Sequence, residues 1–555
     1  MKPKALVVLL LLLFPLYLSA GTRPLRVELP EKAVQGEPVE VRYVFEVSSS
    51  WSFMGLEQEV EGLRLVSRNF EENWLSPSVI QIVITYQVKG VIVGDLELPP
   101  VQVLTNAGTK QYPSGTLHFE PHPDYGKAWT EAREFLKRQG EDCRELEWRY
   151  TDKGIHAFYD AQRKSFAWVG PDGVVAFGVN APMWDGKKKI IVGDLFNAYG
   201  DGRFVTVPEG AVEPLLGDIA YGQEGIYCEG FPKGSYQGRD STCVAGCGAV
   251  ALAQLLRFYG PDVRPSGKGQ VTLDGQSPIS VDIHKIDWNN LKVNELIYLS
   301  AASVRTHLSP VRSTSISLEL RHALVGNWGF SPECQFGFDL PLEETVNRVC
   351  MDLDAGRPVF LGGHNHVFVC DGYKDGFLHF NFGWDGNCNG WYRLPEGFSI
   401  QECLTAMRPM LPEEDYALDV TLKKAGTLAS VIPEERCLTV TRLKVSGKIR
   451  GEDIALLRRM ATEGMLMDLD LADARIVIDG MLFHNYGHAN VIGTYMFADC
   501  ENLLSLRLPK SISGIEDEAF WGCSCLEHLY LPEGMRLLSE KALAGTPPFL
   551  EVHSE

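Results

Sequence analysis

A segment near the end of the sequence occurs twice, and this repetition restricts the fold of that part of the chain more than any other feature. Residues 497–509 (FADCENLLSLRLP) recur 23 residues later as residues 520–532 (FWGCSCLEHLYLP), with six identical positions at one fixed offset. A Leu-spaced period of about 20 to 29 residues is typical of a solenoid, in which each repeat buries its apolar face against the next. We therefore predict a repeat domain over residues 418–555.

One or two repeats cannot bury their apolar faces alone, so other segments of this domain have to cover them. Three segments before the repeats are available for this: residues 443–445, the helix-like residues 453–462, and residues 466–471. We expect these three segments to form the cap on which the repeats stack.

The sequence has 555 residues, which corresponds to about three to five domains of ordinary size. Its first 20 residues resemble a signal peptide, because Lys2 and Lys4 precede the apolar residues 5–13 and small residues end at Ala20. An uncleaved N-terminal anchor is the alternative. No later apolar run reaches the roughly 18 residues that a membrane span needs. We predict a protein that is secreted, or held at the cell surface or in the periplasm.

The net charge and the cysteine content limit which partners and how many disulfides we expect. Lys and Arg number 52 against 72 Asp and Glu, a net charge of −20, so neither nucleic acid nor an anionic membrane is an expected partner. The 13 cysteines are scattered, and their odd number leaves at least one thiol unpaired unless it pairs between chains. We therefore do not expect disulfides to hold the fold, and an unpaired thiol in an exported protein needs a chemical reason.

The N-terminal part has the pattern of β-structure. Residues 39–45 and 79–88 alternate apolar and polar side chains, and Gly and Pro bound the runs. This pattern predicts an Ig-like β-sandwich over residues 23–108. Residues 29–39 resemble the exported Ig-like domains of the oxygen-tolerance (BatD) type, which implies binding or spacing and no chemistry.

A second module follows the predicted sandwich. The sequence predicts a helix over residues 127–138, then alternating strands over 148–182 around the turn at 170–173. We place this helix and β-module within residues 126–205. From residue 211 to about 410 the pattern changes to mixed helix and strand, and the residues suited to chemistry lie there.

Cys247 precedes a strong helical pattern over residues 249–258. The unpaired N–H groups and the positive dipole end at a helix N-terminus favour a thiolate, so this is a suitable place for a nucleophile. On this segment alone, a small buried structural cysteine is an equally open interpretation.

A thiolate nucleophile needs a base, and His366 begins a predicted hairpin that turns at Asp375 and Gly376. The returning strand would bring Asn381 close to His366, where an amide can orient an imidazole. His364, His379 and His322 are the rival histidines. His364 and His366, two residues apart on a strand, could instead form a metal pair, but no third ligand at metal spacing is evident. We therefore predict no metal ion and no cofactor.

A tetrahedral intermediate also needs a hydrogen-bond donor for its oxyanion. Gln223 precedes Cys247, so that the chain order is Gln, Cys, His, Asn. Taken alone, Gln223 would be interpreted as an ordinary surface residue.

At this point the chain resembles the streptopain-like cysteine peptidases, which are secreted bacterial enzymes with a papain-like α+β fold. The resemblance covers about residues 212–410. It rests on ordered motifs: PLLG at 214–217, YGQ at 221–223, GCGA at 246–249 with Gln254, IDWNNL at 286–291, LVGNWGF at 324–330, GRPV at 356–359, HVFVCDGY at 366–373, LHFNFGWDG at 378–386 and NGWYRL at 389–394.

The resemblance implies a role for each matching residue. Cys247 would be the nucleophile, His366 the general base and acid, and Gln223 the oxyanion side chain. Asn381, with Trp384 among its neighbours, would orient the histidine. The repeats likewise resemble the BspA-like leucine-rich repeats of bacterial surface proteins.

The chain departs from the family pattern at three places. Gly248 stands where the family usually has Val, Phe382 where it has a Trp that packs against the catalytic His, and Asp385 where it has Gly. Family members are made as zymogens, and residues 148–182 resemble the inhibitory pro-region. A second structural β-module is the alternative for that segment.

The predicted protein is multidomain, with an N-terminal β-sandwich, a central papain-like α+β domain and a C-terminal leucine-rich repeat solenoid. The predicted function is that of a cysteine endopeptidase acting on a protein or peptide substrate, with a surface or protein partner bound through the repeats. One alternative is a catalytically inactive papain-like adhesin. The other is an amidase or transamidase that uses the same Cys/His pair on cell-wall peptides.

Overall fold

The structure is a computed structural model that describes residues 9–11, 25–47, 51–56, 60–76, 79–105, 108–182, 195, 198–199, 202–283, 286–315, 318–478, 489–535, 540–547 and 550–554. The chain divides into two compact units. The first comprises Met1–Pro214, Pro341–Cys350 and Cys370–Ser399, and the second comprises Leu215–Leu340, Met351–Val369 and Ile400–Glu555. The boundary passes through strand β23 (His366–Lys374), so each unit contains part of that strand.

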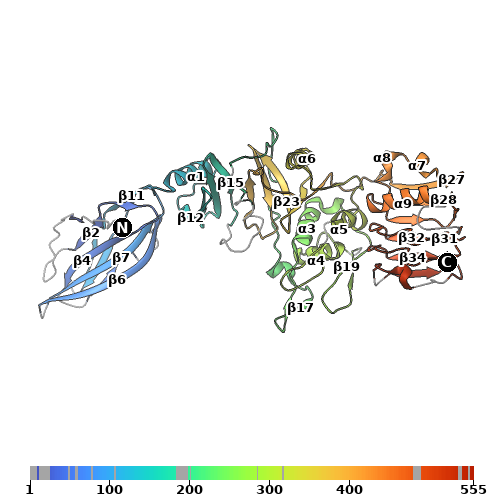
Figure 1. The fold of residues 1–555 in the computed structure, drawn as a ribbon. Coiled ribbons are helices and arrows are strands. Elements are labelled where there is room, and N and C mark those ends of the chain that lie inside the picture. The colour runs from blue at the N-terminus through green and yellow to red at the C-terminus, as the bar shows by residue number, and fades with distance from the viewer. Residues whose placement is uncertain are drawn as a thin grey trace. The chain divides into compact units, whose positions relative to one another are not determined.

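The N-terminal part of the first unit consists of three sheets (Figure 1). The five-stranded sheet has the order β1-β2-β4-β7-β6, with β1 at Leu9–Leu11, β2 at Arg26–Pro30, β4 at Pro38–Val47, β7 at Val79–Gly90 and β6 at Leu63–Ser76. The smaller sheets are β10-β9-β5 (Gly108–Tyr112, Val101–Thr105, Trp51–Met54) and β3-β11-β8 (Ala33–Val34, Thr116–Glu120, Gly94–Glu97).

Both strands that the sequence predicts in this part are present. β4 and β7 pair antiparallel with Tyr43 opposite Ile84, and both of these side chains are fully buried. Strands of all three sheets contribute to one hydrophobic core, as the alternation requires. The interpretation of these sheets as an Ig-like sandwich stays a prediction. Apart from Leu9–Leu11, which pair with β2, the predicted signal peptide lies outside the described residues.

The predicted helix and β-module form the next part of the first unit. Helix α1 spans Gly126–Arg138 and is followed by the antiparallel strands β12 (Glu147–Asp152), β13 (Ile155–Asp160), β14 (Ser165–Gly170) and β15 (Gly173–Gly178). The indole of Trp129 in α1 is buried and donates a hydrogen bond to the Leu146 carbonyl oxygen at 2.6 Å. The turn at residues 170–173 joins β14 to β15, as predicted.

The sheet of this module continues into a later segment of the chain. Ala176 of β15 lies opposite Tyr392 of β25 (Gly390–Tyr392), which pairs with β24 (Phe377–Asn381). β24 neighbours β23, and β16 (Ala211–Val212) also pairs with β23. Asp375 and Gly376, with φ of 51° and 81°, form the predicted turn between β23 and β24.

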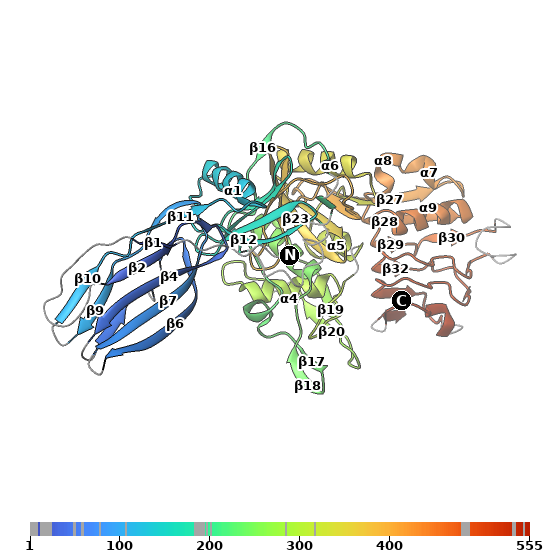
Figure 2. The same cartoon turned by 60° about the vertical axis from the view of Figure 1, so that its left-hand side comes forward.

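The second unit begins with a part of mixed helix and strand. Its helix α3 (Cys247–Tyr259) packs beside α4 (Val293–Ser303), and the hairpin β17–β18 (Lys233–Tyr236, Arg239–Thr242) extends from this part (Figure 2). The sheet order in this unit is β23, β22 (Val359–Gly363), β26 (Glu402–Thr405), β21 (Gln335–Phe338). The other elements are η2 (Gly225–Cys228), η3 (Gly260–Asp262), β19 (Lys268–Val271), β20 (Ile279–Asp282), α5 (Leu318–His322) and η4 (Ala323–Asn327). Helix α6 (Leu342–Asp354) belongs to the first unit up to Cys350 and to the second unit from Met351.

The small and apolar residues of α3 explain why this helix lies in the core. Residues 248–256 are all buried, because Ala and Leu alternate around the helix and allow elements to pack on every side. The helix starts at Cys247, in agreement with the sequence prediction.

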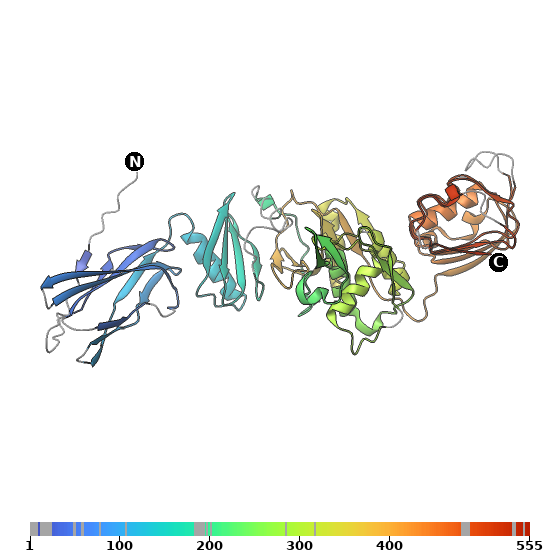
Figure 3. The same ribbon diagram turned by 90° about the horizontal axis from the view of Figure 1, so that it is seen from below.

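The C-terminal part of the second unit is a sheet of parallel strands stacked one beside another (Figure 1); Figure 3 looks along this stack. The strands are β27 (Ala417–Leu422), β28 (Arg442–Ile449), β29 (Asp468–Asp470), β32 (Ser505–Arg507), β34 (His528–Leu531) and β35 (Glu551–Ser554), with β30 (Ala474–Ile476) beside β28. Shorter elements are α7 (Leu428–Val431), α8 (Glu434–Cys437), α9 (Gly451–Thr462), β31 (Val491–Ile492), β33 (Gly514–Ile515) and η5 (Glu540–Leu543).

The register of this sheet explains the repeated sequence. Leu443, Leu469, Leu506 and Leu529 lie opposite one another on successive strands, and all are buried. The next position in the row, Val552, follows Leu529 at the same spacing of 23 residues that separates Leu529 from Leu506. The predicted cap segments coincide with β28, α9 and β29, and β29 pairs directly with β32 of the repeats.

All 13 cysteines have free thiols, so disulfides do not hold this fold. Among the described residues, no helix is both long and apolar enough to cross a membrane.

Candidate active site

Cys247 is the first residue of α3 and is half-buried. The residue before it, Gly246, caps the helix with φ of 83°, a conformation that glycine adopts most readily. A Cβ at Gly246 would also lie 3.2 Å from the Ser313 carbonyl oxygen. Glycine therefore lets the chain turn into α3 and places Cys247 at the helix N-terminus.

Cys247 and His366 line the same cavity of the second unit, which has a volume of about 230 Å³. The remaining lining residues are Ala245, Gly246, Gly248, Thr306, Arg312, Ser313, Thr314, Ser315, Gly363, Asn365, Val367, Gln401 and Glu402. A thiol and an imidazole in one cavity are the two groups that nucleophilic catalysis by cysteine requires.

The surroundings of Cys247 act on its thiol in opposite directions. Burial raises the pKa of Cys247, because a charged thiolate loses its hydration there. Hydrogen bonds from the backbone of Val367, Gly248 and Cys247 itself lower that pKa, as does the positive charge of Arg312. Burial is the largest effect, so the backbone N–H groups at the helix start favour the thiolate, as expected, but do not outweigh the loss of hydration. The thiol needs a base to take its proton.

His366 is the first residue of β23 and is half-buried. The two residues before it, His364 and Asn365, have φ of 52° and 57° and form the turn between β22 and β23. His364 therefore lies in a turn, and the strand pair of His364 and His366 on which the metal alternative depends is not present.

The other two rival histidines occupy different places. Nδ1 of His379 lies 2.6 Å from a carboxylate oxygen of Asp371, whose side chain is buried. His322 is buried in α5, and burial lowers its pKa to about 3, so that its imidazole is neutral at ordinary pH. Neither residue lines the cavity of Cys247.

Gln223 is half-buried, and its backbone holds it next to the cysteine segment. Its carbonyl oxygen accepts a hydrogen bond from the Ala245 N–H at 3.1 Å, two residues before Cys247. The same oxygen accepts one from the Cys228 thiol at 2.9 Å. The structure thus places the Gln223 backbone beside the loop that leads into α3.

Gln254 connects the Gln223 segment to α3, a role that the sequence analysis missed. Oε1 of this fully buried residue accepts the backbone N–H of Tyr221 at 2.9 Å. Arg257, one turn further along α3, donates from Nε to the Tyr221 hydroxyl at 3.1 Å. One helix therefore positions both Cys247 and the segment that carries Gln223. The signal in the sequence was a polar Gln in the middle of an apolar helix.

Asn381, Phe382 and Trp384 lie in the first unit: Asn381 is the last residue of β24, and the other two follow in the turn after it. Oδ1 of Asn381, which is buried, accepts the Gly383 N–H at 3.1 Å. The ring of Phe382 is fully buried and stacks on Trp384, with 5.0 Å between ring centroids. These contacts pack the turn against the end of β24, and the predicted orientation of His366 by Asn381 stays a prediction.

The two remaining departures from the family pattern have local explanations. A Cβ at Gly248 would lie 2.6 Å from the Ser315 hydroxyl oxygen, and both residues line the cavity of Cys247. A larger residue at position 248 would therefore displace this hydroxyl. Asp385 is exposed and has φ of 57°, a value that glycine would adopt more easily.

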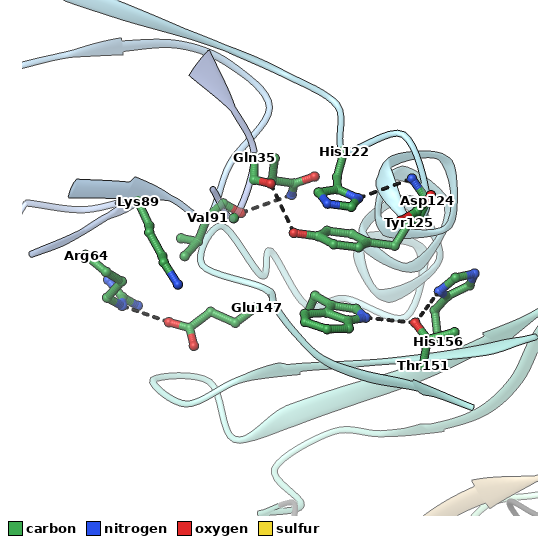
Figure 4. Close-up of a pocket in the computed structure, with 12 residues that line it drawn as sticks. Gln35, Arg64, Lys89, Val91, His122, Asp124, Tyr125, Glu147, Thr151 and His156 are labelled. Atoms are coloured by element: carbon green, nitrogen blue, oxygen red, sulfur yellow. Dashed lines mark hydrogen bonds and ion pairs between the residues drawn. The ribbon is translucent and has the colours of Figure 1, made fainter. Parts of the chain in front are cut away.

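A larger cavity, of about 720 Å³, lies in the first unit and contains none of the predicted site residues (Figure 4). The rings of His122 and Trp148 stack on opposite sides of Tyr125 there, with centroid distances of 4.1 and 5.0 Å. The Tyr125 hydroxyl donates to the Gln35 carbonyl oxygen at 3.1 Å. Size alone therefore does not identify the catalytic cavity.

Two segments of the chain match known protein families. Residues 221–392 match the Peptidase C10 family, and residues 485–553 match the BspA type leucine rich repeat region. The first match contains Cys247, His366, Gln223, Asn381 and Trp384.

The curated proteins similar to this chain include a protease of Porphyromonas gingivalis and one of Streptococcus pyogenes. The thiol protease/hemagglutinin PrtT of Porphyromonas gingivalis is 26% identical over 211 residues, which are 34% of this chain and 24% of that protein. Streptopain of Streptococcus pyogenes is 24% identical over 180 residues, 27% of this chain and 45% of streptopain. The chain thus spans less than half the length of each of these relatives.

Among solved structures, the match to a fragment of prointerpain A from Prevotella intermedia covers 48% of this chain and 99% of that fragment. Its sequence identity is 20% and its TM-score is 0.41. The match to active interpain A of the same organism covers 35% of this chain and 94% of the interpain A chain. Its sequence identity is 22% and its TM-score is 0.31. The central part of this chain is thus similar in sequence to the Peptidase C10 family, and its C-terminal part to BspA-type leucine-rich repeats.

Proposed function

We propose that the chain is an exported cysteine endopeptidase in which Cys247 and His366 form the catalytic pair. The observation that carries this proposal is the shared cavity, which both the thiol at the start of α3 and the imidazole at the start of β23 line. The cavity lies within the segment that matches the Peptidase C10 family.

The mechanism is acyl transfer. His366 accepts the proton of the Cys247 thiol, and the sulfur attacks the carbonyl carbon of a peptide bond. The tetrahedral intermediate collapses to a thioester when the C–N bond breaks and His366 donates the proton to the leaving amine. Water, deprotonated by His366, then attacks the thioester, releases the new carboxylate and restores the thiol. This cycle needs no metal or redox partner.

Gln223 supplies a side-chain N–H to the oxyanion of the intermediate. Such a donor is effective only if its position is set before the reaction, because reorganisation would cost part of the stabilisation. The bonds of the Gln223 carbonyl oxygen to Ala245 and Cys228, together with the Gln254–Tyr221 bond, supply this restraint. Asn381 orients the His366 ring, and Trp384 shields that contact from water.

The flanking parts have roles that follow from the resemblances. Residues 1–20 direct export, and residues 23–108 form an Ig-like sandwich that acts as a spacer or binding module. Residues 126–205 form a pro-segment that inhibits the peptidase until it is cleaved, and residues 211–410 are the catalytic domain. Residues 418–555 form a leucine-rich repeat solenoid that binds a surface or protein partner. Export is consistent with the curated relatives and with the BspA-type repeats.

The test is proteolysis of casein by the purified chain, with and without an epoxide inhibitor of cysteine peptidases. Cys247→Ala is expected to abolish cleavage, because no other group supplies the nucleophile. Cys243→Ala is the matched control, since it removes a buried thiol four residues away that does not line the cavity. Full cleavage by Cys247→Ala would refute the assignment.

Two further results would identify the alternatives. An inactive adhesin would neither cleave casein nor react with the epoxide, and His366→Ala would not change its labelling. An amidase or transamidase would react with the epoxide but cleave only a cell-wall peptide.

A further inference from the structure

Three side chains with metal-binding atoms lie together on the last two strands of the C-terminal sheet. His528 is on β34, and Glu551 and His553 are two residues apart on β35. The strands pair in parallel, with His528 opposite Glu551 and Tyr530 opposite His553. Leu529, between His528 and Tyr530, points into the core and is fully buried. Because side chains alternate along a strand, the two histidines and the glutamate share the other face.

The distances among the three donor atoms match the coordination shell of a zinc ion. Nδ1 of His528 lies 3.2 Å from Nε2 of His553, and Oε2 of Glu551 lies 3.5 and 3.7 Å from these two nitrogens. In a tetrahedral site with metal–ligand bonds of about 2.0–2.1 Å, neighbouring donors lie roughly 3.3–3.4 Å apart. One ion can therefore contact all three atoms with little movement of the side chains.

The surroundings orient one of these ligands. The ring of His553 stacks on Tyr530 with 4.6 Å between centroids, and the Arg507 guanidinium covers that tyrosine at 4.6 Å. This stack holds the His553 ring with its Nε2 toward His528. The adjacent Glu527 carboxylate is paired with Arg305 at 3.3 Å, so it does not compete for the same ion.

We propose that His528, Glu551 and His553 bind one Zn²⁺ ion, with a water molecule as the fourth ligand. Two imidazoles and one carboxylate suit zinc, whereas magnesium and calcium prefer oxygen ligands. The three side chains are 35–64% exposed, so an ion reaches them without any opening of the fold. The sequence analysis predicted no metal site because it considered only His364 and His366.

The ion would stabilise the end of the repeat sheet. β35 pairs with β34 through only four residue pairs, and it lies at one edge of this sheet among the described strands, with β27 at the other. A Zn²⁺ ion held by one residue of β34 and two of β35 joins the two strands. A ligand that binds only the folded state stabilises that state. Zinc is therefore expected to slow hydrogen exchange of the β34 and β35 amides.

The test is a zinc titration of the full chain in competition with a chromophoric chelator. A Cys247→Ala background removes the half-buried catalytic thiol, which could itself bind zinc. In this background we expect one equivalent of Zn²⁺ to be bound in competition with the chelator. The additional substitutions His553→Ala and Glu551→Gln are each expected to lose that equivalent.

His118→Ala is the matched control, because His118 is an exposed histidine beside a single carboxylate, Asp95, at 2.6 Å. It is expected to retain the zinc. The circular dichroism and Tm of the metal-free variants should stay close to those of the parent, since none of the substituted side chains is in the core. Equal zinc binding by the parent, His553→Ala and Glu551→Gln would overturn the proposal. An unchanged rate of hydrogen exchange in β34 and β35 on zinc addition would overturn the stabilising role.

Discussion

Replacement of Gln254 by Met tests whether α3 positions the oxyanion segment as well as the nucleophile. Met has nearly the length and volume of Gln, so the fully buried position stays filled. The substitution removes Oε1, which accepts the Tyr221 N–H at 2.9 Å. Tyr221 precedes Gln223 by two residues, so the loss loosens the segment that carries the proposed oxyanion donor.

The structure sets the size of the expected effect. One neutral hydrogen bond contributes about 0.5–1.5 kcal/mol net, which corresponds to roughly a 2- to 13-fold change in rate if the full amount is lost from the transition state. The effect stays below the roughly 10² to 10³ expected for loss of an oxyanion donor itself. The reason is that the Arg257–Tyr221 and Ala245–Gln223 bonds remain.

The effect on stability is expected to be small. Nε2 of Gln254 has no hydrogen-bond partner among the described residues, and its removal offsets part of the cost of the unpaired Tyr221 N–H. We therefore expect kcat for a peptide substrate to fall, with KM and Tm nearly unchanged. Leu255→Met, a substitution at the next buried position of α3, controls for repacking of the helix. Equal kcat values for the two variants would refute the positioning role of Gln254.

Three further predictions concern other residues. Gln223→Ala should lower kcat by a factor of about 10² to 10³ with little change in Tm, because an oxyanion donor acts on the transition state. An unchanged kcat would show that Gln223 is not the oxyanion donor. Phe382→Trp should cost roughly 1–3 kcal/mol by overpacking the cluster around Trp384, visible as a lower Tm, and a higher kcat with unchanged Tm would contradict this packing argument. Arg408 lowers the pKa of Glu414 to about 2, so Glu414→Gln should lower Tm at pH 6. The Tm difference between the variant and the parent should disappear as the pH falls from about 4.5 toward 2, because the Glu414 carboxylate is then protonated. A Tm difference that does not depend on pH would exclude the ion pair as its cause.

Local patterns predicted the elements that carry the site. The helix after Cys247 and the hairpin after His366 depend on side-chain periodicity and on the turn residues Asp375 and Gly376, which act within a few neighbouring residues. The 23-residue repeat likewise predicted the row of buried leucines, because stacking transfers one strand's pattern to the next. Such features can be derived from the sequence because their causes are local.

The fold decided what depends on residues distant in the sequence. Burial, which raises the pKa of Cys247, results from packing against segments more than 60 residues away and outweighs the helix end that the sequence shows. The turn conformation of His364 and the bond from Tyr221 to Gln254 are also absent from any local pattern. His528 and His553 come together because two parallel strands align residues 25 positions apart, and that register exists only in the folded chain. Periodicity can therefore determine an element, whereas desolvation and donor geometry arise only when elements pack.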